Sequence, residues 1–169
     1  MIPEQRKKSW HSIVWFAGQI PRHSFITWMA LLGRLNTKDR IMKWGVVSNS
    51  TCSLCNQQNE DIEHLFFACR FSSIWEKVLQ ISDRARQRFT SRREVSYIVR
   101  RTKEKSIRAK VMKLWFNASV YHVWMARNKI VFAQENQIVD QVFNRIEADP
   151  LGLLYLGLFQ AIKMLSLYH

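Results

Sequence analysis

The chain has 169 residues, of which 47% are hydrophobic and 23% charged, a composition typical of folded globular proteins that excludes extended disorder. Its 26 Lys and Arg residues against 13 Asp and Glu residues leave a net charge of +13, as expected of proteins that bind polyanions. We therefore expect a folded, basic protein with nucleic acid as its first candidate partner. A solubilising surface without a specific partner is the alternative.

The N-terminal segment lacks the pattern of a secretory signal peptide. Trp10, His11 and Ser12 precede any apolar stretch, and no small-residue cleavage site follows. We expect a protein of the nucleus or cytoplasm that is not secreted. The three cysteines are an odd number and lie within eighteen residues of one another, which favours a metal site over disulfides.

Two helices are predicted before the cysteines. Pro21 and apolar residues at three- and four-residue steps predict a helix over 21–33. A second, short helix is predicted between an N-cap at Thr37 and a C-terminal stop at Gly45.

Around the cysteines, the sequence predicts a loop followed by short helices. Residues 46–59 are rich in Ser, Asn and Gln, which indicates a turn or short hairpin. Residues 61–69 predict a short helix with acidic residues in its first turn, and a further helix is predicted from Ser72 or Ser73 to Leu79.

The basic residues gather over residues 84–113, which we call the basic segment. Twelve Lys and Arg residues against two Glu residues give it a net charge of +10. We expect it to contact phosphate backbones with low sequence specificity and a steep dependence on salt. The predicted nucleic-acid contacts are Arg84, Arg86, Arg88, Arg92, Arg93, Arg100, Arg101, Lys103, Lys105, Arg108, Lys110 and Lys113.

Three aromatic residues accompany the basic segment. Trp75, Phe89 and Tyr97 could stack on the bases of a single strand. The alternative is that these rings belong to the core and that the charges form a solvated helix face. The weak apolar periodicity of residues 84–106 predicts that part of this stretch is helical and part is a connection.

The strongest helix pattern of the chain follows. From Ile107 to about Phe132, apolar residues recur at three- and four-residue steps without Gly or Pro. The apolar tail 150–169 is interrupted by Gly, Gln and Lys, which favours a packed terminal helix over a membrane anchor. An oligomer or protein-partner contact through this tail is the other alternative.

The chemistry of the chain is concentrated in one spacing, Cys52-x2-Cys55-x8-His64-x4-Cys69. Three thiolates and one imidazole form the closed tetrahedral shell of a structural Zn²⁺ site. The alternative is that these are buried cysteines beside an unrelated histidine. Four protein ligands leave no open position for a catalytic water, and no phosphate loop, nucleophile elbow or carboxylate pair is present. We therefore expect no enzyme activity and no small-molecule substrate.

Several motifs flank the ligands in a fixed order. They are Trp15, the segment Ile20 to Trp28, the turn Arg34 to Arg40, Cys52-Ser53-Leu54-Cys55, and Glu63 to Cys69 followed by Ile74-Trp75. In these motifs the region resembles the zinc-binding domain at the C-terminal end of the reverse transcriptases of plant non-LTR (LINE-type) retrotransposons. A weaker match follows downstream, where Trp124 to Phe132 looks like the Trp-x-x-Arg-Asn segment that often trails this domain.

The resemblance implies zinc ligation by Cys52, Cys55, His64 and Cys69 in a module that helps to hold template nucleic acid. The polymerase, endonuclease and ribonuclease H motifs of the parent polyprotein are absent from the sequence, which suggests a detached fragment or a stand-alone gene. A zinc-stabilised protein-interaction domain, or a retroelement fragment without a selected function, are the alternatives.

We expect an all-α fold, a small helical domain organised around the zinc loop. The predicted division is a zinc-binding domain over residues 1–80, a basic helical or linker segment over 81–106, and a C-terminal helical extension over 107–169.

Overall fold

The structure, a computed structural model, is all-α, as the sequence predicts. It describes residues 9–81, 90–148 and 157. Within these ranges no strand forms, and an isolated antiparallel bridge between Thr51 and Asn59 closes the loop that contains Cys52 and Cys55. The helices are α1 (His11–Val14), α2 (Pro21–Leu31), α3 (Lys38–Lys43), the π-helix η1 (His64–Ala68), the 3-10 helix η2 (Arg70–Ser72), α4 (Ser73–Ile81), α5 (Ser91–Arg101), α6 (Ile107–Ala133) and α7 (Val139–Glu147).

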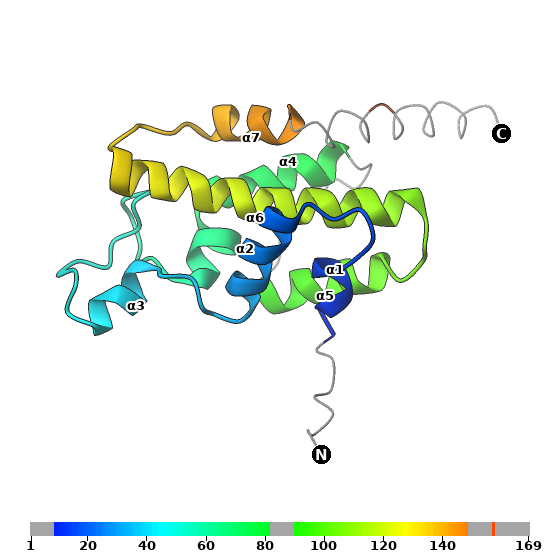
Figure 1. Cartoon of the computed structure of the whole chain (residues 1–169). Coiled ribbons are helices and arrows are strands. Elements are labelled where there is room, and N and C mark those ends of the chain that lie inside the picture. Colours follow the sequence, from blue (N-terminus) through cyan, green and yellow to red (C-terminus); the bar gives the residue numbers. More distant parts are fainter. Residues whose placement is uncertain (1–8, 82–89, 149–156, 158–169) are drawn as a thin grey trace, which may run out of the picture.

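The long helix α6 is the centre of the fold, and most of the other helices pack around it (Figure 1). It contacts α2, α5, η1, η2, α4 and α7, and α7 also contacts α4. Because neighbours surround it, α6 buries residues on several faces rather than on one stripe. The predicted helices over 21–33 and from Ile107 to Phe132 are thereby confirmed.

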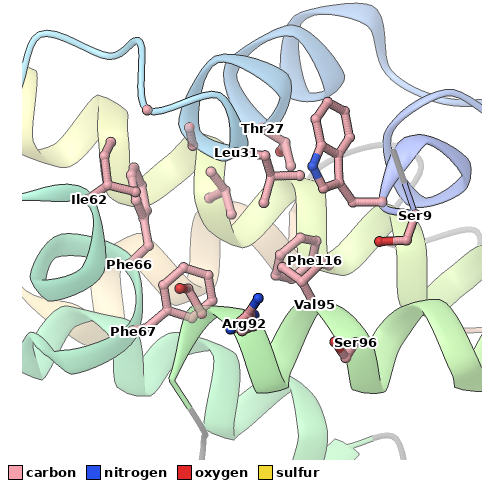
Figure 2. A pocket seen from close by; sticks show the side chains of 15 residues that line it. Ser9, Thr27, Leu31, Ile62, Phe66, Phe67, Arg92, Val95, Ser96 and Phe116 are labelled. Atoms are coloured by element: carbon pink, nitrogen blue, oxygen red, sulfur yellow. The ribbon is translucent and has the colours of Figure 1, made fainter. Parts of the chain in front are cut away.

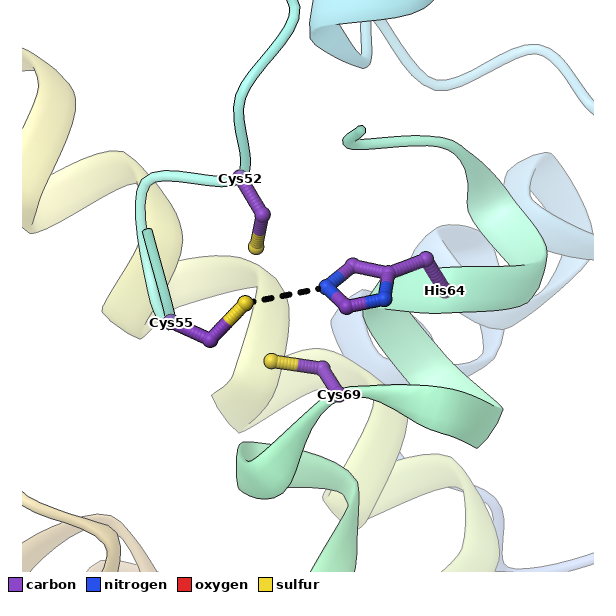
Figure 3. Close-up of side chains that lie close together, drawn as sticks. All are labelled: Cys52, Cys55, His64 and Cys69. Carbon is purple, nitrogen blue, oxygen red and sulfur yellow. Dashed lines mark hydrogen bonds between the residues drawn. The ribbon is translucent and has the colours of Figure 1, made fainter. Parts of the chain in front are cut away.

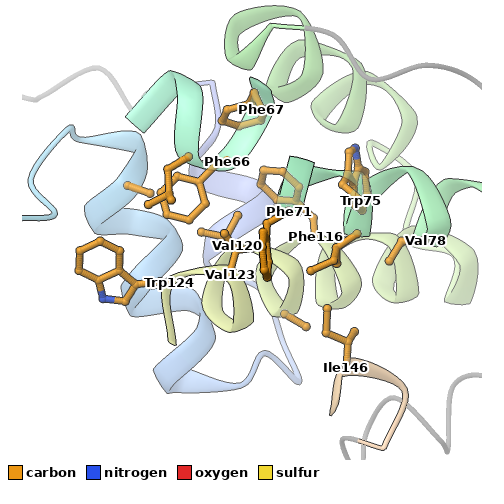
Figure 4. Packing of buried hydrophobic residues seen from close by; sticks show 14 of the residues in the cluster. Phe66, Phe67, Phe71, Trp75, Val78, Phe116, Val120, Val123, Trp124 and Ile146 are labelled. Carbon is orange, nitrogen blue, oxygen red and sulfur yellow. The ribbon is translucent and has the colours of Figure 1, made fainter. Parts of the chain in front are cut away.

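One hydrophobic core joins the region around the cysteines to α6 and α7 (Figure 4). Phe71 is 1% exposed, and the rings of Trp75 and Phe116 meet edge to face with centroids 5.4 Å apart. Ile146 of α7 closes the far side of the cluster. The division of the chain at residues 80 and 106 stays a prediction, but this core contains residues from both sides of those boundaries.

The sequence pattern predicts the bounds of α6 but not the exposure of its last turn. Phe132 was expected on the apolar face, but its side chain is 78% exposed. The helix ends one residue later, where Gln134 takes a left-handed conformation with φ of 55°, and no described element covers this last turn at Phe132. The apolar periodicity of the sequence continues to the end of α6, whereas the packing of neighbouring elements against the helix stops before it.

No helix in the described ranges is long and apolar enough to cross a membrane. The apolar tail, residues 150–169, lies outside the described residues apart from Gly157, so its role as a packed helix, partner contact or anchor stays a prediction.

Removal of the N-cap of α6 is expected to cost about 1 kcal/mol of unfolding free energy. The Ser106 side chain accepts a hydrogen bond from the backbone N–H of Ala109 at 3.2 Å, which satisfies one of the donors left open at a helix start. Denaturant unfolding of Ser106→Ala measures the effect. The adjacent exposed substitution Lys105→Ala is the control and should change the free energy by less than about 0.5 kcal/mol; equal effects would contradict the capping role.

Candidate metal centre

Four buried side chains meet at one point of the structure (Figure 3). The three sulfurs of Cys52, Cys55 and Cys69 and one ring nitrogen of His64 all lie within 4.8 Å of one another. Cys55 Sγ and His64 Nε2 are 3.2 Å apart. The cysteines form no disulfides, so their sulfurs are available as ligands.

The first two cysteines are presented by a tight loop. The backbone N–H of Cys52 donates to Gln58 O at 2.7 Å, and the N–H of Asn56 donates back to Cys52 O at 2.9 Å. Asn56 has a φ of 56°, a left-handed conformation that asparagine tolerates better than most residues. The chain thereby turns sharply after Cys55, so that both sulfurs point to the same side (Figure 3).

The other two ligands depend on the π-helix η1. In an α-helix, residues five apart point about 140° away from each other. Here the backbone N–H of Cys69 donates to His64 O at 2.6 Å, which is the five-residue hydrogen bond of a π-turn. This wider turn brings the two side chains to the same point. The predicted short helix over 61–69 is confirmed, but its π-helical geometry was not predicted.

Two hydrogen bonds position His64, one at its imidazole and one at its backbone N–H. Its Nδ1 lies 3.0 Å from Gln58 Oε1, which leaves Nε2 directed at the sulfurs. The Asp61 carboxylate accepts a hydrogen bond from the backbone N–H of His64 at 2.6 Å and so caps this turn. Such outer contacts set the tautomer and direction of metal-binding histidines.

The thiols of Cys52 and Cys69 share a hydrogen bond. It lowers the pKa of Cys52 to about 5 against the opposing effect of burial. The same hydrogen bond, reinforced by burial, raises the pKa of Cys69. A lowered pKa at Cys52 favours the thiolate, which is the form in which a cysteine binds a metal cation.

The donor set fits zinc. Ligands about 2.0–2.3 Å from a tetrahedral Zn²⁺ lie roughly 3.3–3.8 Å from one another, so the observed cluster needs only small side-chain shifts. Three sulfurs and one nitrogen complete the tetrahedron and leave no position for a water or substrate, which is typical of a structural site.

A buried ion pair supports the metal loop from α6. Glu60 and Arg127 have side chains 0% and 2% exposed, and Glu60 Oε1 lies 2.7 Å from Arg127 Nη2 and 2.9 Å from its Nε. The same carboxylate accepts hydrogen bonds from the backbone N–H groups of Lys38 at 3.0 Å and Ser53 at 3.3 Å. Arg127 also donates to Asn36 O at 3.2 Å. One carboxylate therefore ties α3, the metal loop and α6 together.

Sequence reasoning did not identify this pair as part of the site. Arg127 belongs to the Trp-x-x-Arg-Asn segment, and its guanidinium lies over the ring of Trp124 with 5.0 Å to the centroid, while it also donates to Asn128 at 3.0 Å. The segment was the available indication, but nothing in the spacing connects it with Glu60, 67 residues earlier.

The structure places most of the described basic segment on the surface. Arg92, Arg93, Arg100 and Arg101 are exposed on α5, and Lys103, Lys105, Arg108 and Lys110 are exposed on the following loop and the start of α6. Lys113 differs, since it is half-buried with its Nζ 5.5 Å from the ring centroid of Phe16, and burial lowers its pKa. Arg84, Arg86 and Arg88 lie outside the described residues.

The prediction that Trp75 stacks on bases is wrong. Its ring is 4% exposed and its indole N–H donates to Glu94 Oε1 at 2.6 Å. Its apolar ring fills the space between α4 and Phe116 of α6, a long-range contact that local sequence does not show. Tyr97 is half-buried, and Phe89 lies outside the described residues.

Comparison with known proteins agrees with the metal site. Residues 1–75 match the model of a family described as zinc-binding in reverse transcriptase. No curated protein and no solved structure matches the chain. The match over this part of the chain and the buried cluster of three cysteines and one histidine together support a zinc-binding module with Zn²⁺ as its cofactor.

Proposed function

We propose that this protein is a non-catalytic zinc-binding module, derived from the reverse transcriptase of a plant LINE-type retrotransposon, that contacts the backbone of RNA or DNA through the described part of its basic segment. The matched family and the flanking motifs around the ligands support the origin. The closed ligand set supports a structural metal. Three reduced thiols suit the nucleus or cytoplasm, where disulfides are rare.

The observation that supports nucleic-acid contact most directly is the distribution of charge on α5. Its only acidic residue, Glu94, is 0% exposed and accepts a hydrogen bond from the indole of Trp75. The four arginines of the helix are exposed. The carboxylate is therefore withdrawn into the core, and the exposed side of α5 is basic without compensation along the helix, as a phosphate-binding surface requires.

The metal centre also positions this basic helix. Glu63, the residue before the ligand His64, accepts a hydrogen bond from the backbone N–H of Ser91 at 2.9 Å. Ser91 is the first residue of α5, so the carboxylate caps its positive end. Bound zinc holds the turn that contains Glu63 and His64, and this turn in turn holds the start of α5. We therefore expect nucleic-acid binding to require zinc, although the nucleic acid does not contact the metal.

Binding to a fluorescently labelled single-stranded oligonucleotide is expected to weaken steeply with salt, because each phosphate contact releases counterions. The double variant Arg93→Gln/Arg101→Gln should reduce the magnitude of the slope of log K against log[salt] by about 1.4, because each of the two lost phosphate contacts on a single strand contributes about 0.7. Fluorescence anisotropy over a salt series measures the slope.

The matched control is Arg34→Gln/Lys43→Gln, which removes two exposed charges elsewhere on the chain. Its slope should equal that of the unmodified protein. Equal slopes for the two double variants would mean that only net charge matters, and no binding at low ionic strength would end the proposal.

An exposed apolar group on and after α3 favours protein interaction as a second candidate function. Met42, Trp44 and Val46 are 40%, 58% and 68% exposed, and adjacent exposed apolar side chains of this kind often mark protein contacts. A stable dimer by multi-angle light scattering, indifferent to nucleic acid, would support this function over nucleic-acid contact.

A further inference from the structure

A cavity of about 450 Å³ lies between α2, η1, α5 and α6 (Figure 2). Its wall contains four aromatic residues, Trp10, Phe66, Phe67 and Phe116, together with aliphatic side chains such as Val95 of α5. This volume is within the range of small-molecule and cofactor sites, which are mostly apolar with a few placed polar groups.

One polar group in this wall has no partner within the structure. The Thr27 side chain is 0% exposed, and its hydroxyl makes no hydrogen bond. A buried hydroxyl without a partner costs about 1–3 kcal/mol, so such groups usually mark a missing partner. Thr27 lies on α2 beside Leu31 at the cavity wall (Figure 2), where a ligand that displaces a neighbouring side chain can accept or donate the missing hydrogen bond.

The cavity continues into a basic groove. A second hollow, of about 690 Å³, shares Ser9, Arg92 and Ser96 with the cavity. Its remaining lining consists of Val99 and three basic residues, Arg93, Arg100 and Lys103, without any acidic residue. Arg92, Ser96 and Arg100 are four residues apart on α5 and follow one side of the helix over about 12 Å.

We infer that the cavity binds one base of a single-stranded nucleic acid whose phosphates lie along the groove. This inference rests on the proposed function and adds the site. A base has flat faces that stack on aromatic rings and a polar edge that can pair with the Thr27 hydroxyl. Its attached backbone is an anion, which matches Arg92 and Arg100 outside the cavity.

Two variants separate the cavity from the groove. Thr27→Val removes the hydroxyl and keeps the shape, so the fold should be unchanged or slightly more stable. Ser96→Trp places a large ring at the shared mouth from an exposed helix position. Ala133→Trp, at an exposed small residue at the end of α6, is the matched control.

The probes are an oligothymidylate and an abasic phosphodiester strand of equal length. The unmodified protein and Ala133→Trp are expected to bind the oligothymidylate about tenfold more tightly than the abasic strand. This is the affinity that one stacked base contributes. Ser96→Trp should abolish this preference and Thr27→Val should reduce it, while both keep their affinity for the abasic strand. Thermal melting confirms that each variant is folded.

Three other outcomes would overturn the base site. Equal binding of both strands by the unmodified protein would overturn the base site and leave backbone contact standing. Failure to bind either strand would overturn the proposed function as well. Saturable binding of a fluorescent fatty acid that Ser96→Trp blocks, without a preference between the strands, would assign the cavity to an amphipathic anion instead.

Discussion

Removal of zinc by exhaustive chelation is expected to unfold residues 46–75. The bound ion contributes on the order of 10 kcal/mol in zinc-finger peptides, which is comparable to the whole stability of a small domain. Without the metal, three buried sulfurs and one buried imidazole face one another with no ion to hold the loop around Cys52 and the π-turn after His64 together. Hydrogen exchange should show loss of protection over this segment, and far-ultraviolet circular dichroism should show loss of helix.

Cys69→Ser is expected to have nearly the same effect, because it leaves three ligands and replaces a buried sulfur that is 1% exposed. Ser53→Ala is the matched control, since Ser53 lies between the first two ligands and its hydroxyl makes no hydrogen bond. Metal analysis should give about one zinc per chain for Ser53→Ala and the unmodified protein, and less for Cys69→Ser. Melting and circular dichroism unchanged after chelation would contradict a structural role.

The ligand set could be predicted from the sequence because its chemistry is local. Cys52 and Cys55 are separated by two residues in a polar loop, and His64 and Cys69 lie at the start and just past the end of one short helix. The helices α2 and α6 were predictable for a similar reason, since an apolar pattern at three- and four-residue steps specifies a helix whatever it packs against.

The parts that could not be predicted depend on distant contacts. The burial of Trp75 depends on Phe116, and the exposure of Phe132 depends on where the neighbouring elements end. The π-turn at His64 is selected by the need to bring Cys69 to the same point, a requirement that helix propensity does not describe. Glu60 reads in the sequence as an ordinary surface acid, yet it is 0% exposed.

Arg127→Met is expected to destabilise the protein by about 3–5 kcal/mol, because it leaves the Glu60 carboxylate buried without its counter-ion. Methionine keeps much of the apolar stem, so the loss is mainly electrostatic. Denaturant unfolding in saturating zinc measures it. Lys129→Met, on the same helix, breaks the exposed pair with Glu135 at 3.1 Å and should cost less than about 1 kcal/mol.

The pair should also be coupled in a double-mutant cycle. Glu60→Gln/Arg127→Met removes both charges and keeps an amide oxygen for the backbone N–H of Lys38, so its destabilisation should be clearly smaller than the sum of the single variants. Additive effects would show that the two side chains act independently and would contradict the role of this ion pair in joining α3, the metal loop and α6.

The same ion pair has a consequence for the matched segment. Residues 1–75 contain all four zinc ligands but not α6, which supplies Arg127 and the apolar surface opposite η1 and η2. A fragment of residues 1–80 is therefore expected to remain largely unfolded in saturating zinc, since Glu60 would be unpaired and the core incomplete. Addition of residues 107–148 as a separate chain should restore its hydrogen-exchange protection, whereas the same chain with Arg127→Met should not. A 1–80 fragment that is fully protected by zinc alone would show that the metal centre is independent of α6.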